Sequence, residues 1–295
     1  MDALLGQVLD ALDASGVAED TVVAFHSDHG WALGENNMFR KFHNAELTTR
    51  VPLVVAVPWM KEMHGKHSHA IVELVDVMPT LIGLANLPQP TSSSSIGDDR
   101  VAGDSGDSGS GGGGGEPVPL SGISQAAVLM DAGATLKHYA LSQYPRCPAD
   151  PQILWKRNWC IQVPSNAFGW MGYSIRTDLD GGWRYTAWMP WNGTTLKPVT
   201  SITSRTAPPL NGTNGFYEEL YGPYNTTAGV NSEESDFNAL DVVEVSAEFP
   251  GIAATLFAKL VSMIKSPSAP PPESAHLIDD GELVLLRETA VPIKN

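Results

Sequence analysis

The chain has 295 residues, of which 42% are hydrophobic, so it can build a sizeable core as one large domain or two modest ones. Its 18 basic and 33 acidic side chains give a formal net charge of -15, which argues against nucleic acid as a partner. The sequence has no run of about eighteen apolar residues, so it predicts no membrane span.

The first predicted element is a helix at the start of the chain. Leu4, Val8 and Leu12 repeat at helical spacing, and Gly16 stands where helices commonly end. This start is acidic, unlike a targeting segment. The helix is expected to pack on a sheet and to lead into a strand at residues 21–25. Because it leads directly into an interior strand, we expect the sequence to be a fragment, or a truncated gene model, that lacks a preceding segment.

Candidate ligands follow that strand. Residues 21–25 are β-branched, aromatic and uncharged, which predicts a strand buried on both faces of a parallel sheet. Asp28 and His29 come directly after it, where open α/β sheets place their ligands, and Gly30 lets the chain turn. The pair is either two metal ligands or a turn in which Asp28 caps the next segment. Lys41 favours a ligand site, because the chain can fold back and bring its ammonium to the same end of the strand, where it would bind an anionic ligand.

The next predicted strand is residues 51–57, an apolar run with Pro52 near its start, where a strand tolerates proline. A polar stretch with three close histidines follows it: His64, His67 and His69. We interpret this stretch as a surface connection, because no carboxylate or cysteine completes a metal site.

Composition predicts four regions along the chain. Residues 1–90 form the first, and within it residues 71–84 predict a helical stretch in which a first segment ends, and a helix begins, at Pro79. Residues 91–119 are rich in serine and glycine and predict a flexible insertion. A smaller domain is expected at residues 120–265, followed by a proline-rich tail at residues 266–295.

The smaller domain shows a pattern of short strands and one long helix. A turn composition at residues 178–182 predicts a hairpin between two of the strands. Residues 247–264 are apolar along one face and predict a helix that covers an antiparallel sheet. The four predicted strands are residues 139–144, 169–177, 183–189 and 216–221.

Several stretches, taken together, resemble the second half of the sulfatase catalytic domain. Residues 27–35 read Ser-Asp-His-Gly-Trp-Ala-Leu-Gly-Glu, and Lys41 and Val-Pro-Leu-Val at residues 51–54 follow in the family's order. The wording Trp-Ala-Leu-Gly-Glu is similar to the iduronate-2-sulfatase branch of that family. Later stretches agree with the same family: residues 74–85, 142–146, 171–177 and 183–186.

This resemblance implies an α/β fold: a partial alkaline-phosphatase-like sheet with helices, and a smaller C-terminal α+β subdomain with an antiparallel sheet. It implies a hydrolase of sulfate esters on glycosaminoglycan-like sugars, with a calcium ion held partly by Asp28 and His29. Lys41 matches the lysine that binds the sulfate and takes part in catalysis. On residue chemistry alone zinc is the rival, since imidazole suits zinc better than calcium.

The formylglycine nucleophile of sulfatases has no match in this sequence. The two cysteines, Cys147 and Cys160, both lack the required Cys-x-Pro/Ala-x-Arg context, so we expect the chain to be inactive alone. They form either a structural disulfide or two free core thiols.

Further site residues are expected on a loop that leads out of the small sheet, which the resemblance places near the mouth of the pocket. Gln143 and Arg146 are predicted to bind substrate. Arg146 either pairs with a uronate carboxylate or ties the two domains together. Glu35 and His43 lie near the proposed site in sequence and are given no role.

The sequence also carries three glycosylation acceptors, at Asn192, Asn211 and Asn225. They favour a glycoprotein of the secretory pathway, lysosomal or extracellular, although no signal peptide is visible in the sequence. Three functions remain open: a sulfatase-type hydrolase, a phosphate-ester hydrolase of the same superfamily, and a non-catalytic remnant that binds sulfated glycans.

Overall fold

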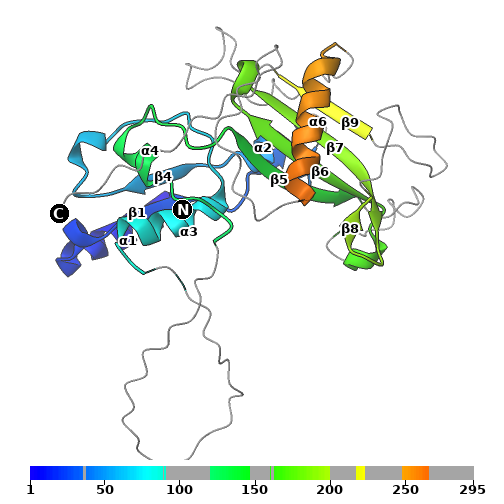
Figure 1. The fold of residues 1–295 in the computed structure, drawn as a ribbon. Coiled ribbons are helices and arrows are strands. Elements are labelled where there is room, and N and C mark those ends of the chain that lie inside the picture. The colour runs from blue at the N-terminus through cyan, green and yellow to red at the C-terminus, as the bar shows by residue number, and fades with distance from the viewer. Residues whose placement is uncertain are drawn as a thin grey trace, which may run out of the picture.

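A computed structural model describes eight parts of the chain: residues 1–35, 38–88, 90, 120–146, 160, 163–199, 217–222 and 248–265. The elements fall into two groups (Figure 1). One holds α1, β1, β4, α3 and α4, and the other is a larger sheet, β5 to β9, with α6 lying across it. The predicted insertion at 91–119 and the predicted tail at 266–295 lie outside these parts.

The predicted first helix is confirmed, but not its packing. Helix α1 spans Asp2–Ser15 and ends at Gly16, which has φ of 76°. None of its residues is buried, and Leu4 and Val8 are 60% and 65% exposed. The prediction that this helix packs on a sheet is therefore wrong for the residues that the structure describes. The spacing of the apolar residues predicts that the segment is helical. It does not predict burial, which requires another element packed against the apolar face of the helix.

The strand that leads to the candidate ligands pairs differently from the prediction. Strand β1 (Val23–His26) runs antiparallel to β4 (Leu53–Ala56), with Val23 opposite Ala56. Phe25 is 42% exposed, so β1 is not buried on both faces. The expected parallel, fully buried strand is a wrong prediction here. An uncharged apolar run indicates a strand, but it does not specify which neighbour pairs with it.

Short elements connect β1 with β4. A small antiparallel ladder, β2 (Ala32–Leu33) with β3 (Phe39–Arg40), precedes the one-turn helix α2 (Glu46–Thr49). After β4, the turn η3 (Lys61–Met63) leads into the histidine-rich stretch. His64, His67 and His69 are all exposed, which confirms the surface interpretation.

The segment after β4 is anchored by a buried aspartate. The turn η4 (Leu74–Asp76) leads into α3 (Val77–Leu84), so the helix begins two residues before Pro79 rather than at it. Asp76 is 2% exposed, and its carboxylate pairs with the ammonium of Lys137, which is itself 5% exposed. Lys137 also donates to Glu73 Oε2 at 2.6 Å.

Two further bonds reach the same anchor from the segment that holds α4 (Ala126–Met130). The backbone N–H of Ile123 donates to Asp76 Oδ1 at 3.0 Å, and Gln125 Nε2 donates to Asp76 Oδ2 at 3.2 Å. Polar bonds thus hold residues 73–76 against residues 123–137, on either side of the sequence interval 91–119.

The larger sheet confirms the predicted antiparallel subdomain. Strands β5 (Tyr139–Arg146), β6 (Trp170–Thr177) and β7 (Trp183–Asn192) are consecutive neighbours, and β9 (Tyr217–Tyr221) and the short β8 (Lys197–Pro198) also pair with β7. The short turns η6 (Ser165–Ala167) and η7 (Leu179–Gly181) precede β6 and β7. The predicted hairpin turn between β6 and β7 contains Asp180 and Gly182, both at positive φ.

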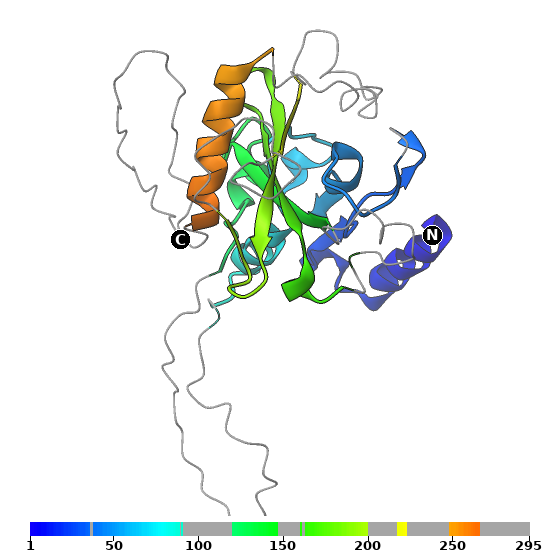
Figure 2. The ribbon, with the colours of Figure 1, turned by 90° about the vertical axis from the view of Figure 1, so that its right-hand side faces the viewer.

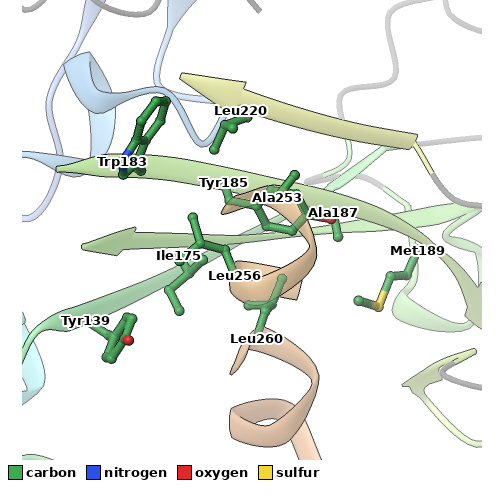
Figure 3. Close-up of a cluster of buried hydrophobic side chains, with 10 residues drawn as sticks. All are labelled: Tyr139, Ile175, Trp183, Tyr185, Ala187, Met189, Leu220, Ala253, Leu256 and Leu260. Atoms are coloured by element: carbon green, nitrogen blue, oxygen red, sulfur yellow. The ribbon is translucent and has the colours of Figure 1, made fainter. Parts of the chain in front are cut away.

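Helix α6 (Pro250–Lys265) covers one face of this sheet and encloses its core, as predicted (Figure 2). Tyr185, Met189 and Leu220 point from the sheet towards Leu256 and Leu260 of the helix, and all five are at most 3% exposed (Figure 3). The other face of the sheet turns towards the group that holds β1 and β4.

Candidate functional site

The candidate ligands lie in a tight turn after β1 that leaves no room for a side chain at Gly30. The Gly30 N–H donates to Thr48 O at 2.8 Å, so the turn is bonded to α2. A Cβ placed on Gly30 would come within 2.0 Å of the Leu47 carbonyl oxygen. The predicted need for glycine is confirmed, and its cause is the close approach of the α2 backbone.

The hydrogen bonds of His29 fix which of its nitrogens carries the proton. Nδ1 lies 2.9 Å from Gly30 O, and a carbonyl oxygen only accepts, so Nδ1 donates. Nε2 lies 2.5 Å from Lys41 Nζ, and an ammonium only donates, so Nε2 offers its lone pair. An Nδ1–H bonded to a backbone carbonyl, with Nε2 free to coordinate, is a usual state of a metal-binding histidine.

Asp28 adds a second electron-rich atom next to that nitrogen. Its Oδ1 accepts the His29 N–H at 3.0 Å, while Oδ2 lies 3.2 Å from His29 Nε2. The carboxylate is 80% exposed and the imidazole 29%. Two lone pairs at this distance repel each other unless a cation lies close by, and the Lys41 ammonium supplies that charge here. The structure therefore brings Asp28, His29 and Lys41 together, while their roles stay predictions.

Two other polar side chains near this turn, Glu35 and His43, form hydrogen bonds that stabilise the local structure. Glu35 Oε2 accepts the Leu33 N–H at 2.6 Å, and bonds to backbone N–H groups hold the Glu35 pKa below its usual range. His43 is 8% exposed, and its Nδ1 accepts the Thr48 hydroxyl at 2.7 Å. No group of three or more His, Cys, Asp or Glu side chains is placed to hold a metal within the described parts of the chain.

The loop after Lys41 is seated on the larger sheet, which the sequence did not reveal. The Phe42 ring lies 6.0 Å from the Tyr144 ring of β5. Asn44, 4% exposed, donates through Nδ2 to Gly172 O of β6 at 3.0 Å. The sequence carries no signal for this contact, because the burial of Asn44 is visible only in the structure.

An ion pair extends the same contact, since Arg176 Nε on β6 lies 3.2 Å from Glu46 Oε1 on α2. The position of Lys41 thus depends on residues more than a hundred positions later in the chain.

The two predicted substrate residues lie on strand β5 itself, not on a loop leading out of the sheet, and they lie on different faces of the sheet. Arg146 pairs with Trp170, and Gln143 with Tyr173, so the strand's alternation points Arg146 and Gln143 in opposite directions. The Arg146 guanidinium carbon lies 4.6 Å from the centroid of the Trp188 ring. This stack is within the sheet. Ties between the two groups of elements are made by other residues, among them Asn44, Glu46 and Glu73, whose Oε1 accepts the Leu141 N–H of β5 at 2.7 Å.

A broad groove lies between the segment that includes η1 (Ala18–Asp20) and α3, and His26 at the end of β1 is among its lining residues. It has a volume of about 1140 Å3, and Asp28, His29 and Lys41 do not line it. Its lining is largely apolar and includes Val22, Trp59, Leu74, Met78 and Leu81. Met78 and Trp59 are 56% and 49% exposed, so this surface is incompletely covered.

Among the predicted modification sites, Asn192 is exposed at the end of β7, and its Oδ1 accepts the N–H groups of Thr194 and Thr195. Asn211 and Asn225 belong to stretches that the structure leaves undescribed.

Of the two cysteines, Cys160 is disulfide-bonded, and Cys147 lies outside the described parts of the chain. No helix in those parts is long and apolar enough to cross a membrane.

Comparison with known proteins shows what the chain is similar to. Residues 1–87 match the sequence model of the Sulfatase family. A solved protein in complex with its substrate D-glucosamine-2-N,6-O-disulfate shares the fold, with a TM-score of 0.52 and 19% identity over 92% of this chain and 40% of that one.

Particular relatives carry the sequence similarity further along the chain. Iduronate 2-sulfatase of Mus musculus is 36% identical over 216 residues, which is 64% of this chain and 36% of that protein. Iduronate 2-sulfatase of Homo sapiens is 30% identical over 235 residues, 65% of this chain and 36% of that one. Residues 1–87 thus match the Sulfatase family, as the sequence motifs predicted. The chain spans about 36% of the length of these curated relatives.

Proposed function

We propose that this chain carries part of a sulfate-ester hydrolase site, in which Asp28 and His29 bind a divalent cation and Lys41 binds the sulfate group. One observation carries the proposal: Asp28 Oδ2 and Lys41 Nζ both lie close to His29 Nε2, at 3.2 and 2.5 Å. The sulfatase relationship of residues 1–87 supports sulfate as the ligand.

The donor atoms fit two positions of a metal site. His29 offers the lone pair of Nε2, which in the structure meets the Lys41 ammonium, and Asp28 offers an exposed carboxylate oxygen. We propose calcium as the ion, with zinc as the alternative that the imidazole favours. When bound, such a cation neutralises sulfate oxygens and activates the attacking oxygen. Calcium takes six to eight oxygen ligands, so the proposal requires further oxygens from outside this pair.

Lys41 has two possible partners in this proposal. In the structure its ammonium interacts with the His29 lone pair, which a cation would take. We therefore expect metal and ammonium to compete for Nε2, so that metal binding releases Lys41 towards the sulfate. A compact ammonium is suited to that role, because it meets an anion as a point charge.

The proposed substrate is a sulfated uronate of a glycosaminoglycan-like sugar. Similarity to two iduronate 2-sulfatases supports this choice, and Arg146 is the proposed partner of the uronate carboxylate. Neither cysteine of the sequence has the nucleophile context, so we propose that these 295 residues bind the substrate without turning it over. The exposed Asn192 fits a glycoprotein of the secretory pathway.

The apolar groove is the proposed position of the rest of a sulfatase-type domain, whether it is supplied by the same polypeptide or by another. Support comes from the exposed apolar residues Trp59 and Met78 and from the 36% share of the relatives' length that the chain spans.

Metal binding tests the site directly. Titration of the 295-residue chain with Ca2+ and with Zn2+ should show binding that weakens at least about tenfold in Asp28→Asn and His29→Gln. The matched control is Glu35→Gln, which changes a nearby carboxylate that is bonded to Leu33. Equal metal affinity in the wild type and Asp28→Asn would contradict the ligand assignment.

Turnover tests the second part of the proposal. We expect no hydrolysis of an aryl sulfate by these 295 residues. Binding of a sulfated uronate should weaken in Lys41→Met. Measurable hydrolysis that depends on Lys41 would overturn the proposed lack of turnover while supporting the site. Sulfated-sugar binding that is unaffected by Lys41→Met would overturn the site itself.

A further inference from the structure

Trp188 is held from three sides on the face of the sheet opposite α6. It is 7% exposed, and its indole N–H donates to Glu219 Oε1 at 2.7 Å. Its ring lies against Gly172, where an added Cβ would come within 2.4 Å of Cζ3. The Arg146 guanidinium stacks on it, 4.6 Å from the ring centroid. The ring therefore has a single position, defined by a hydrogen bond, a backbone surface and a cation.

That stack restricts Arg146, whose side chain is otherwise exposed at the end of β5. A free arginine loses rotamer entropy when a ligand orders it. Stacking on an aromatic face orders the guanidinium beforehand and leaves its planar edge able to form a bidentate fork with a carboxylate. Arg146 is thus preorganised to bind a planar anion.

Gly172 connects this arrangement with the Lys41 loop. Its carbonyl oxygen accepts a hydrogen bond at 3.0 Å from Nδ2 of Asn44, which is three residues after Lys41 in the sequence. The Trp188 ring packs against the Cα of Gly172, where a side chain would otherwise be. A second connection runs along β5, where Tyr144 contacts Phe42 and lies two residues before Arg146, roughly 7 Å away along the strand. The Arg146 side chain and the loop that carries Lys41 are therefore both held against the same part of the sheet.

We propose that Trp188, seated on Gly172 and bonded to Glu219, is a positioning residue that holds Arg146 at a set spacing from Lys41. The site then recognises a sugar that carries a sulfate ester and a carboxylate together. This inference rests on the proposed function, because it takes Lys41 as the group that binds the sulfate. Trp188 itself does not touch the ligand.

The test compares two ligands that differ only in the second charge: a uronic acid 2-sulfate and its methyl ester. Their affinities for the 295-residue chain are measured by NMR titration. The acid should bind roughly tenfold more tightly than the ester, since one charge-assisted bidentate contact has that order of effect. The ratio of the acid's affinity to the ester's affinity should fall to about one in Arg146→Met and in Trp188→Leu, with the ester's affinity unchanged.

Two further variants separate positioning from general stability. Trp188→Phe keeps a ring face under Arg146 and should retain most of the acid-to-ester ratio. Leu260→Ala weakens the core on the other face of the sheet and should leave the ratio unchanged. If Trp188→Leu does not fold, the comparison of Trp188→Phe with Arg146→Met and the resonance of the Trp188 indole N–H provide the readout.

Each outcome bears on a different statement. A ratio that Arg146→Met abolishes and Trp188→Leu preserves would overturn the positioning role while leaving the proposed function standing. A ratio of about one in the wild type would also overturn it. Failure of both ligands to bind, or binding that Lys41→Met does not weaken, would overturn the proposed function and this inference with it.

Discussion

Replacing Gly30 by alanine should damage the turn that carries the candidate ligands. The added Cβ would meet Leu47 O at 2.0 Å and the Leu47 carbonyl carbon at 3.0 Å, both backbone atoms. Ordinary contact begins near 3.4 Å, so α2 or the turn must move by about 1.4 Å. Overpacking of this kind costs about 1–3 kcal/mol, and loss of the Gly30–Thr48 hydrogen bond adds about 1 kcal/mol.

The expected total for Gly30→Ala is a loss of about 2–4 kcal/mol in the free energy of unfolding, measured by urea denaturation. The imidazole nitrogen resonances of His29 should shift as well, since Nδ1 is bonded to Gly30 O. The matched control is Gly6→Ala in α1, where nothing lies within 4 Å of the added carbon. Alanine favours a helix interior by up to about 1 kcal/mol, so the control has the opposite sign. Unchanged stability and unchanged His29 resonances in Gly30→Ala would refute this reasoning.

Three other predictions concern stability. Lys137→Met leaves the buried Asp76 without its cation and should cost about 3 kcal/mol in urea denaturation, and a loss below about 1 kcal/mol would contradict the anchor. Leu256→Ala, under the sheet, should cost about 2–5 kcal/mol by the same assay, and a neutral result would mean that α6 does not cover the core. Burial raises the pKa of Tyr139 and Tyr144, so the unfolded chain ionises first. The contribution of these two tyrosines to the free energy of unfolding is complete below about pH 10 and is lost as the pH rises through their folded-state pKa. Denaturation at several pH values with tyrosine absorbance would check it, and constant stability above pH 10 would count against it.

Local patterns predicted the elements whose signals are contained within a few residues. Gly16 ends α1 at positive φ, and the Asp-Gly composition at 178–182 gives the β6–β7 hairpin. The apolar face of residues 247–264 became α6, which begins at Pro250. In each case the determining interaction is between near neighbours or along one periodic face.

Pairing and contacts between distant segments were not predictable in the same way. The composition of β1 is compatible with either strand direction, and its antiparallel partner β4 lies about thirty residues later. Asn44 reads as an ordinary loop residue until its bond to Gly172 is seen. Trp188 likewise reads as one more apolar strand residue, because neither Glu219 nor Arg146 is near it in sequence.

The Asp76 anchor has a consequence for the continuity of the backbone. Lys137, Ile123 and Gln125 all bind a carboxylate that precedes the interval 91–119, so the two flanking segments are held by direct bonds rather than by the peptide that joins them. A proteolytic cut within that interval should therefore yield two polypeptides that co-migrate in gel filtration and separate only in denaturant. Variation in the length of the interval between related chains is tolerable for the same reason, since the bonded surfaces do not depend on it.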